Sequence, residues 1–365
     1  MLKAFVASTA LVALTLLADA ARSAERVPAT ARKVVIENAE TGYRWKLIEA
    51  PVQQPGPRQV LVRVRAVGLN RGDWEILPSN NSSGRLVGRI PGSDAAGDIV
   101  AVGKDVRGFR PGMRVTSLYF RNWVDGTASK EIIEAAHGVD VDGVVGEYIV
   151  FEDTAVVQAP RSLSYEEAAT LPTAGLTAWN ATAGKNELRD RVVLVQGTGG
   201  VSIFALQFAN AAKARVIVTS SSDDKLVRAR ELGARDGINY RTHPKWSEEV
   251  MKLTGGHGAD LVVDVGGKDS LDQSVKSLAY GGMLSIVGGL SGYDGAISSL
   301  GLLNKTASAR GVYVGSRADY QRMSAFIDEQ RVKPVIDKVF PLDRFDAALA
   351  HLRDSNSIGR VILKL

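Results

Sequence analysis

A glycine-rich segment lies between an apolar run and a helical pattern, and its spacing suits the binding of a phosphate group. The segment reads Gly197-Thr198-Gly199-Gly200-Val201-Ser202. Its first glycine permits a tight turn, and its second lets a pyrophosphate approach the backbone at the start of the following helix. Ser202 stands where a third glycine is usual, and serine is small enough for close packing of a helix on a strand. We therefore predict a dinucleotide-binding turn formed by Gly197, Gly199, Gly200 and Val201.

The residues after the next apolar run indicate which dinucleotide is bound. They read Thr219-Ser220-Ser221-Ser222-Asp223-Asp224-Lys225. Proteins that bind NAD place an acid here to hold the ribose 2′-hydroxyl, whereas Ser221, Ser222 and Lys225 would donate to a 2′-phosphate. Such charge-assisted bonds contribute roughly 1.5–3 kcal/mol each. Asp223 and Asp224 weaken this interpretation, and we expect them to cap the following helix. The pattern favours NADP(H) over NAD(H).

The composition excludes several other kinds of site. The chain has no cysteine, which rules out disulfides, thiol nucleophiles and cysteine-bound zinc. None of its four histidines is spaced as a metal-binding pair, so we predict no metal site. The net charge is +5, from 45 basic and 40 acidic residues without a basic stripe, so we expect no nucleic-acid partner.

The N-terminus resembles a secretory signal. A short basic start precedes an apolar run over residues 4–18, and Ala18-Asp19-Ala20 is the best cleavage site. We interpret residues 1–24 as a signal peptide, which predicts a secreted or periplasmic protein. NADP(H), however, is a cytosolic metabolite and no twin-arginine pair is present, so a cytoplasmic location is the alternative. No later segment is apolar for long enough to span a membrane.

The pattern of apolar residues changes once along the chain. Residues 32–160 carry short alternating runs between Gly and Pro turns, which is typical of an antiparallel, barrel-like β domain. We predict strands there at 33–36, 60–67, 96–102 and 148–150, and a short helix near 130–136.

From residue 161 to residue 310 strands alternate with helices, which predicts a parallel sheet covered on both faces. Ser164 is expected to cap a helix that starts at Tyr165. The remaining expected strands lie at 191–196, 215–219, 261–265 and 283–287, with helices at 201–212 and 224–232. For residues 311–365 we predict helices at 320–329 and 345–352 and strands at 338–340 and 360–363.

Several ordered motifs are shared with a known family. They are Ala66-Val67-Gly68-Leu69-Asn70-Arg71-Gly72-Asp73, Pro91-Gly92-Ser93-Asp94-Ala95-Ala96-Gly97, Leu171-Pro172-Thr173-Ala174-Gly175-Leu176-Thr177-Ala178-Trp179, the glycine turn, and Gly233-Ala234 leading to Ile238-Asn239-Tyr240. With these motifs the chain resembles the medium-chain dehydrogenase/reductase superfamily, in its zinc-free, quinone-reductase-like branch, from about residue 32 to the end. The resemblance implies an α/β protein with a GroES-like β-barrel domain, built from residues 32–160 and the C-terminal return at 311–365. A Rossmann domain with a doubly wound parallel sheet would occupy 161–310.

The departures from that family bear on the chemistry. Zinc alcohol dehydrogenases of this superfamily have cysteine where Asn70 stands and His-Glu where Ser93-Asp94 stand, and their structural zinc uses four cysteines. The resemblance implies that Asn70 and Thr177 face the nicotinamide and the substrate. It also implies further cofactor contacts, around the 2′-phosphate at Ser222, Lys225 and Tyr240, and along the nicotinamide at Val287, Gly288, Val314 and Gly315.

Without a metal, hydrogen-bond donors must stabilise the charge that hydride transfer creates. Reduction of a quinone, an enone or another carbonyl compound suits such a site. Asn70 would donate to the substrate oxygen, with a turn-forming contact as its alternative role. Tyr119 is a candidate proton source, and packing in a loop is its alternative role, as for Phe120 and Trp123.

Two other functions stay open at this stage. The protein could bind NADPH as a carrier or sensor without catalysis, or it could be an alcohol dehydrogenase with a substituted metal site. A small-molecule substrate is expected in the catalytic cases. The resemblance also leaves a homodimer open, since dimers are common among relatives, but no interface can be recognised in the sequence.

Overall fold

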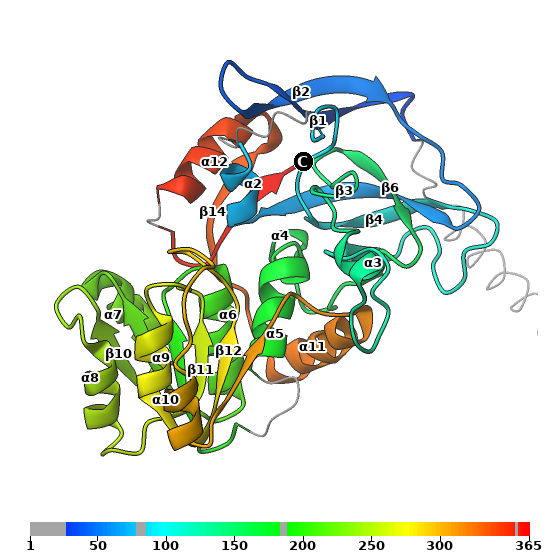
Figure 1. Ribbon diagram of the computed structural model, residues 1–365. Coiled ribbons are helices and arrows are strands. Elements are labelled where there is room, and N and C mark those ends of the chain that lie inside the picture. The colour runs from blue at the N-terminus through cyan, green and yellow to red at the C-terminus, as the bar shows by residue number, and fades with distance from the viewer. Residues whose placement is uncertain (1–26, 78–84, 183–187, 355–356) are drawn as a thin grey trace, which may run out of the picture.

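The computed structural model describes residues 27–77, 85–182, 188–354 and 357–365. The predicted signal peptide, residues 1–24, lies outside these residues. Figure 1 shows a β-rich part formed by the blue and cyan strands, and a second part in which yellow and green helices surround a sheet. The red C-terminal segment runs back to the β-rich part. None of the helices in the described ranges combines the length and hydropathy needed to cross a membrane.

The β-rich part contains a hairpin and a larger sheet. Strands β1 (Thr30–Asn38) and β2 (Tyr43–Pro51) pair antiparallel. The larger sheet has the order β14-β15-β3-β4-β5-β7, and β6 pairs with β3. Its strands are β3 (Gln59–Leu69), β4 (Asp94–Val102), β5 (Arg114–Ser117), β6 (Tyr148–Glu152), β7 (Val156–Gln158), β14 (Ile336–Pro341) and β15 (Arg360–Lys364). All the pairs are antiparallel except β14 with β15, which confirms the expected antiparallel β domain.

One apolar core fills this part. Alternate residues of β3, such as Val60, Val62 and Val64, point into it together with the hairpin strands and the C-terminal helix α12 (Phe345–Arg353). A 3₁₀ turn (Leu342–Arg344) leads into α12. Two short helices complete this part, α2 (Arg71–Glu75) and α3 (Lys130–Ile133). The helix expected near 130–136 is therefore shorter than predicted.

The second part is a parallel sheet with the order β10-β9-β8-β11-β12-β13. In chain order this is 3-2-1-4-5-6, the doubly wound arrangement in which ligands bind at the point where the strand order reverses. The strands are β8 (Val192–Gln196), β9 (Arg215–Ser220), β10 (Asp236–Asn239), β11 (Ala259–Asp264), β12 (Leu278–Ile286) and β13 (Ser308–Gly311). The helices are α6 (Gly200–Ala211), α7 (Asp223–Glu231), α8 (Trp246–Leu253), α9 (Leu271–Ser277) and α10 (Ser299–Asn304).

Successive residues of β8 enter different cores because side chains alternate across a strand. Val193 and Val195 pack with α6 in one cluster, whereas Val192 and Leu194 pack with α8 and α9 in another. Both faces are thus covered, as the near-continuous apolar runs predicted. The first cluster also takes in residues of the β-rich part, so the two parts share a packed boundary.

A helical segment connects the two parts. Helix α4 (Tyr165–Ala168) begins at Ser164, whose hydroxyl accepts the Glu167 backbone N–H, as expected for its capping role. A π-helical turn (Leu171–Gly175) then leads into α5 (Leu176–Ala181). Helix α11 (Arg317–Gln330) packs against α5. The family motif at 171–179 therefore forms this turn and most of α5.

Candidate functional site

The glycine turn follows β8 and starts α6 at the reversal of strand order. Gly197 has φ of +75°, a conformation that disfavours side chains. Gly199 is the N-cap residue of α6, and a Cβ there would meet no atom within 4 Å. The Ser202 hydroxyl is buried and donates to the Gln196 carbonyl at 2.7 Å, which joins the first turn of α6 to the end of β8. The turn therefore leaves space for an approaching group at Gly199, whereas at Gly200 a Cβ would lie 2.5 Å from Arg360 Cδ.

The segment expected to hold the 2′-phosphate follows β9. Ser221 and Ser222 are partly exposed, and Ser222 is the N-cap residue of α7. Asp223 and Asp224 lie in the first turn of that helix, and Asp223 accepts a hydrogen bond from Asn239 at 3.0 Å. The expected capping role of the two aspartates is therefore wrong: Ser222 is the N-cap residue, and the aspartates follow it in the first turn.

Lys225 and Tyr240 lie beside this segment. Burial lowers the pKa of the Lys225 amine, the carboxylate of Asp337 raises it, and the cation of Arg241 lowers it further. Tyr240 is 41% exposed and its backbone N–H donates to Ser220 at 3.0 Å. Arg241 is a second cation near Lys225 that the sequence reasoning did not include, although its place directly after Tyr240 could have suggested it.

Two backbone segments are expected to lie along the nicotinamide, and each of them follows a strand of the same parallel sheet. Val287 and Gly288 follow β12, and the Val287 N–H donates to the Asp264 carbonyl at 2.8 Å. Val314 and Gly315 follow β13, and Val314 has a φ of +56°. The side chain of Asn180 on α5 donates to the Val314 carbonyl at 2.8 Å and leaves no space for a Cβ at Gly315.

The register of three strands brings polar residues from distant parts of the chain together. In the β3–β4 pair Gly68 lies opposite Asp94, and in the β15–β3 pair Val361 lies opposite Leu69. Asn70 directly follows Leu69, and Arg360 directly precedes Val361. Asn70, Ser93, Asp94 and Arg360 therefore meet at one end of the sheet, where Thr173 of the π-helical turn joins them. We call these five residues the Asp94 cluster.

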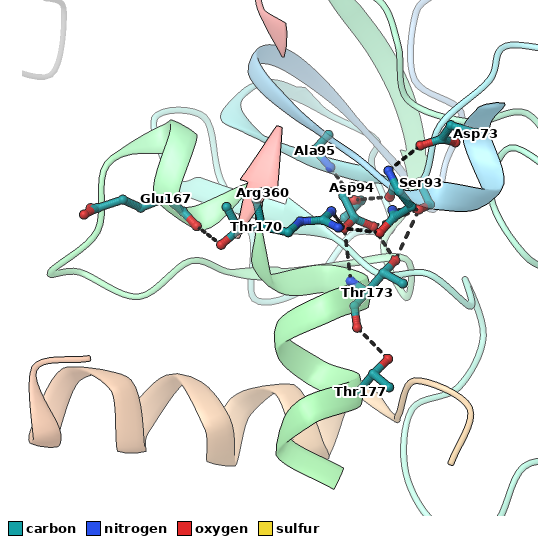
Figure 2. Close-up of polar contacts among 11 residues, drawn as sticks. Asp73, Ser93, Asp94, Ala95, Glu167, Thr170, Thr173, Thr177 and Arg360 are labelled. Atoms are coloured by element: carbon teal, nitrogen blue, oxygen red, sulfur yellow. Dashed lines mark hydrogen bonds and ion pairs between the residues drawn. The ribbon is translucent and has the colours of Figure 1, made fainter. Parts of the chain in front are cut away.

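Asp94 is the centre of this cluster (Figure 2). One carboxylate oxygen, Oδ1, accepts the Ser93 hydroxyl at 2.8 Å and the Thr173 hydroxyl. The other, Oδ2, accepts Arg360 Nη2 at 3.0 Å and the Thr173 backbone N–H at 3.2 Å. Burial raises the pKa of Asp94, and the Arg360 charge and the hydroxyls oppose that rise. Since removing one partner of a buried pair leaves an uncompensated charge, these contacts matter for folding as well as for the site.

Asn70 links the cluster to the start of α2. Its Oδ1 accepts Arg360 Nη1 at 2.8 Å and its Nδ2 donates to the Ser93 hydroxyl at 3.2 Å. Its backbone N–H donates to Asp73 at 2.7 Å. Burial raises the pKa of Asp73 to about 7, while the hydrogen bond from Asn70 opposes the rise. Asn70 thus precedes a helix, as a turn residue would, and its amide also belongs to the cluster.

Thr177 and Tyr119 lie outside the direct contacts of Asp94. The Thr177 hydroxyl donates to the Thr173 carbonyl at 2.6 Å, one turn earlier (Figure 2). The Tyr119 hydroxyl lies 3.3 Å from that of Tyr313, and the Tyr119 ring packs edge-on against Phe120. Burial raises the pKa of Tyr119, which makes its hydroxyl a weaker acid. A role for Tyr119 as a proton source stays a prediction.

The residues of the Asp94 cluster do not match the donor set of a zinc site. Zinc is held by Cys, His and carboxylate ligands, whereas Asp94 is here paired with a guanidinium and neighboured by hydroxyls and an amide. Within the described ranges, no group of three or more His, Cys, Asp or Glu residues could hold a metal ion. The buried His137 donates through Nδ1 to the Leu118 carbonyl at 2.7 Å, and burial lowers its pKa to about 4.

The sequence did not reveal that Thr173 and Arg360 belong to the Asp94 cluster. Thr173 stands inside a family motif, so its position carried a signal. Arg360 stands in an ordinary C-terminal strand, and nothing in the sequence relates it to residues 266 and 290 positions away. Only the strand register reveals it.

Two family models match the chain. The "Alcohol dehydrogenase GroES-like domain" matches residues 56–161 and the "Zinc-binding dehydrogenase" domain matches residues 200–329. A zinc-type alcohol dehydrogenase-like protein of Schizosaccharomyces pombe is 42% identical over 86% of this chain and 92% of its own length. A quinone oxidoreductase of Pseudomonas aeruginosa is 29% identical over 85% of this chain and 92% of its own.

Solved structures agree with these matches. A crystal structure from Sinorhizobium meliloti, described as an alcohol dehydrogenase, has a TM-score of 0.86 and 39% identity over 93% of this chain and 100% of its own. A structure described as an NAD-dependent alcohol dehydrogenase has a TM-score of 0.80 and 33% identity over 92% and 99%. The expected fold of a GroES-like domain with a Rossmann-like parallel sheet is confirmed. With both domains matched and these relatives across its length, the chain belongs to the medium-chain dehydrogenase/reductase superfamily of oxidoreductases.

Proposed function

We propose that this protein is a zinc-independent, NADP(H)-dependent oxidoreductase that reduces a quinone, an enone or another carbonyl compound by hydride transfer. The observation that carries the proposal is the Asn70 amide. This amide stands where zinc-dependent members carry a metal ligand. Its oxygen accepts from Arg360 and its nitrogen donates to Ser93, and the residue is half-buried.

Three features fit the pyrophosphate of a dinucleotide. Gly199 leaves open space at the start of α6, and the first N–H groups of a helix have no partner within the helix and can bind an anion. The side chain of Arg360 runs against Gly200, because a Cβ there would lie 2.5 Å from its Cδ. Among the described residues, the buried Nε of Arg360 has no hydrogen-bond partner. A phosphate oxygen would supply one.

The 2′-phosphate proposal depends on the segment after β9. Ser221 and Ser222 offer hydroxyls, Lys225 and Arg241 offer positive charge, and Tyr240 lies beside them. Asp223 binds Asn239 rather than standing at the end of β9, where a carboxylate would hold the hydroxyl of NAD. One structural neighbour is described as NAD-dependent, which favours NADH instead. The activity test therefore compares NADPH with NADH.

NADPH, when bound, supplies the hydride. The chain's own residues must then orient the substrate and stabilise negative charge on its oxygen. When a carbon–hydrogen bond forms on an enone, the electron pair moves to the carbonyl oxygen, and a proton from water completes the reaction. Asn70 Nδ2 is placed to donate to that oxygen, and Thr177 lies one helical turn from the cluster. The quinone oxidoreductase relative is consistent with an acceptor of this class.

The test is oxidation of NADPH, followed at 340 nm, with a panel of quinones, enones, aldehydes and ketones. We expect turnover with at least one quinone or enone, weaker turnover with NADH, and no loss of rate with a metal chelator. Tight NADPH binding without turnover of any panel member would indicate a carrier or sensor. Activity that a chelator abolishes would indicate a metal-dependent alcohol dehydrogenase.

A further inference from the structure

The orientation of the Asn70 amide follows from the chemistry of its neighbours. A guanidinium has donors only, so the amide atom 2.8 Å from Arg360 Nη1 must be the oxygen. On the other side, the Ser93 hydroxyl donates its hydrogen to Asp94, so it accepts from the amide nitrogen at 3.2 Å. The two contacts exclude the flipped amide, which would place N–H groups against the guanidinium.

Arg360 itself is held firmly. Its side chain is 7% exposed and its Nη2 binds Asp94, whose side chain is fully buried. The preceding residue, Gly359, donates its backbone N–H to the Thr198 carbonyl in the glycine turn at 3.2 Å. The backbone of Arg360 thus follows a residue bonded to the glycine turn, and its guanidinium contacts Asn70.

The Asn70 amide nitrogen serves both Ser93 and the Asp94 carboxylate, whose pKa burial raises and a side-chain hydrogen bond from Asn70 lowers. Nδ2 carries two hydrogens, and Ser93 takes one of them. The residue is only partly buried, and a substrate oxygen that reaches Nδ2 would take the second hydrogen in place of Asp94. A positive charge at Oδ1 draws electrons from the nitrogen, which makes that N–H a stronger donor.

We infer that Arg360 is a positioning residue, which fixes the Asn70 amide with its N–H toward the substrate oxygen and polarises it. The inference deepens the proposed function and rests on it for the identity of the bound oxygen. Developing charge on that oxygen is stabilised by the amide, with the guanidinium behind it. The pair performs, through a neutral donor, the task that a Lewis-acidic metal performs elsewhere.

A double-mutant cycle tests whether Arg360 acts through Asn70. The variants are Asn70→Ala, Arg360→Lys and the double variant, assayed for kcat with an enone at saturating NADPH. Lysine keeps the positive charge beside Asp94 but cannot reach both partners as the guanidinium fork does. We expect Asn70→Ala to lower kcat ~100-fold, in the range for loss of one oxyanion donor. Arg360→Lys should lower kcat in the wild-type background and have no further effect in Asn70→Ala. Equal effects of Arg360→Lys in both backgrounds would overturn the inference.

A second measurement does not depend on turnover. In protein labelled with ¹⁵N asparagine, the Asn70 side-chain amide hydrogens should show nuclear Overhauser contacts to Ser93. Arg360→Lys should weaken them as the amide begins to flip, whereas the control Arg114→Lys should leave them intact. Arg114 is a half-buried arginine that donates to the Leu163 carbonyl. Thermal unfolding and NADPH titration of each variant separate misfolding and lost cofactor affinity from the amide effect.

The two readouts separate this inference from the proposed function. If the wild type turns over no acceptor but the contacts depend on Arg360, the proposed function fails and the positioning role stands. If the contacts persist unchanged in a folded Arg360→Lys protein, the positioning role is wrong whatever the enzyme reduces.

Discussion

The buried pair of Asp94 and Arg360 illustrates how single residues carry both stability and site geometry. Burying two charges is costly, and here hydrogen bonds to Ser93, Thr173 and Asn70 satisfy most of the polar atoms involved. The Nε of Arg360 is the exception and lies beside the glycine turn. A group left without a partner at a proposed phosphate site is consistent with a ligand that completes it.

Lys225 provides the sharpest test of cofactor preference. Replacing it with alanine removes a half-buried cation next to the serines that follow β9. We expect Lys225→Ala to weaken NADPH binding by roughly 10–100-fold, as loss of one charge-assisted contact implies, without changing NADH binding. Fluorescence titration with both cofactors measures this, with the exposed Lys104→Ala as control. Equal weakening for both cofactors would refute the role in 2′-phosphate recognition.

Asp73 predicts a distinctive dependence of stability on pH. Its pKa is raised by burial from 3.8 to about 7, with Asp94 adding to the rise and Arg360 opposing it. The folded state therefore holds this proton more tightly than the unfolded state. The resulting stabilisation is complete below the unfolded pKa and is lost as pH rises through about 7.

We expect this contribution to the free energy of unfolding to fall between those two pKa values, by at most about 1.4 kcal/mol per pH unit. Asp73→Asn should remove the fall, because an amide oxygen still accepts the Asn70 N–H. Urea unfolding across this pH range measures it, with the exposed Asp125→Asn as control. Identical pH profiles for wild type and Asp73→Asn would rule out the shifted carboxyl.

At the scale of elements, the turn between β8 and α6 contains one glycine with a positive φ and one glycine with open space around it. Gly197 needs its positive φ for the turn, whereas Gly199 has an ordinary φ of −73° and an unobstructed Cβ position. The two glycines therefore serve different purposes. Substitution at Gly197 strains the fold, and substitution at Gly199 affects only what approaches the turn from outside.

Gly199→Ala separates folding from cofactor binding. Because a Cβ there meets no protein atom within 4 Å, we expect the midpoint of thermal unfolding to stay within error of the wild type. NADPH affinity should fall at least ~10-fold, because the methyl group occupies the approach of the pyrophosphate. Gly311→Ala, also at an open position with an ordinary φ, is the matched control and should change neither quantity. Unchanged NADPH affinity in Gly199→Ala would place the pyrophosphate elsewhere.

At the scale of the whole molecule, the two parts are joined where their sites meet. Strands β14 and β15 bring the C-terminus back to β3, and Gly359 pairs with Gly199 of the glycine turn. The hydroxyls of Tyr119 and Tyr313 also meet across the boundary between the parts. Relative movement of the two parts would therefore disturb the cofactor turn and the Asp94 cluster together.

The location of the protein is decided by its N-terminus, which lies outside the described residues. We propose that the leader is functional and that cleavage after Ala20 gives a mature chain starting at Ala21. Intact-mass analysis of the native protein from secreted, periplasmic and cytosolic fractions measures this. A chain that begins at Met1 in the cytosol would refute export and remove the conflict with a cytosolic cofactor.

Much of the fold could be predicted because local patterns specified it. The buried runs of β8, β9, β11 and β12 were recognised as strands, and Ser164 correctly marked the start of a helix. Strands β2, β5, β7, β10 and β13 and the helices α2, α5, α8, α9 and α10 were not predicted. Most of them are short, and several, such as β13 and α10, expose many of their residues, so burial leaves little periodic signal.

The sequence by itself determined the family, the glycine turn and the absence of cysteine ligands, because these depend on residue types and short spacings. It also marked Asn70, Ser93 and Asp94 as departures from a zinc site. Only the tertiary structure decided what those residues do together. The register of β15 against β3 places Arg360 beside Asn70 and Asp94, and such a register depends on packing between strands that are distant in the chain.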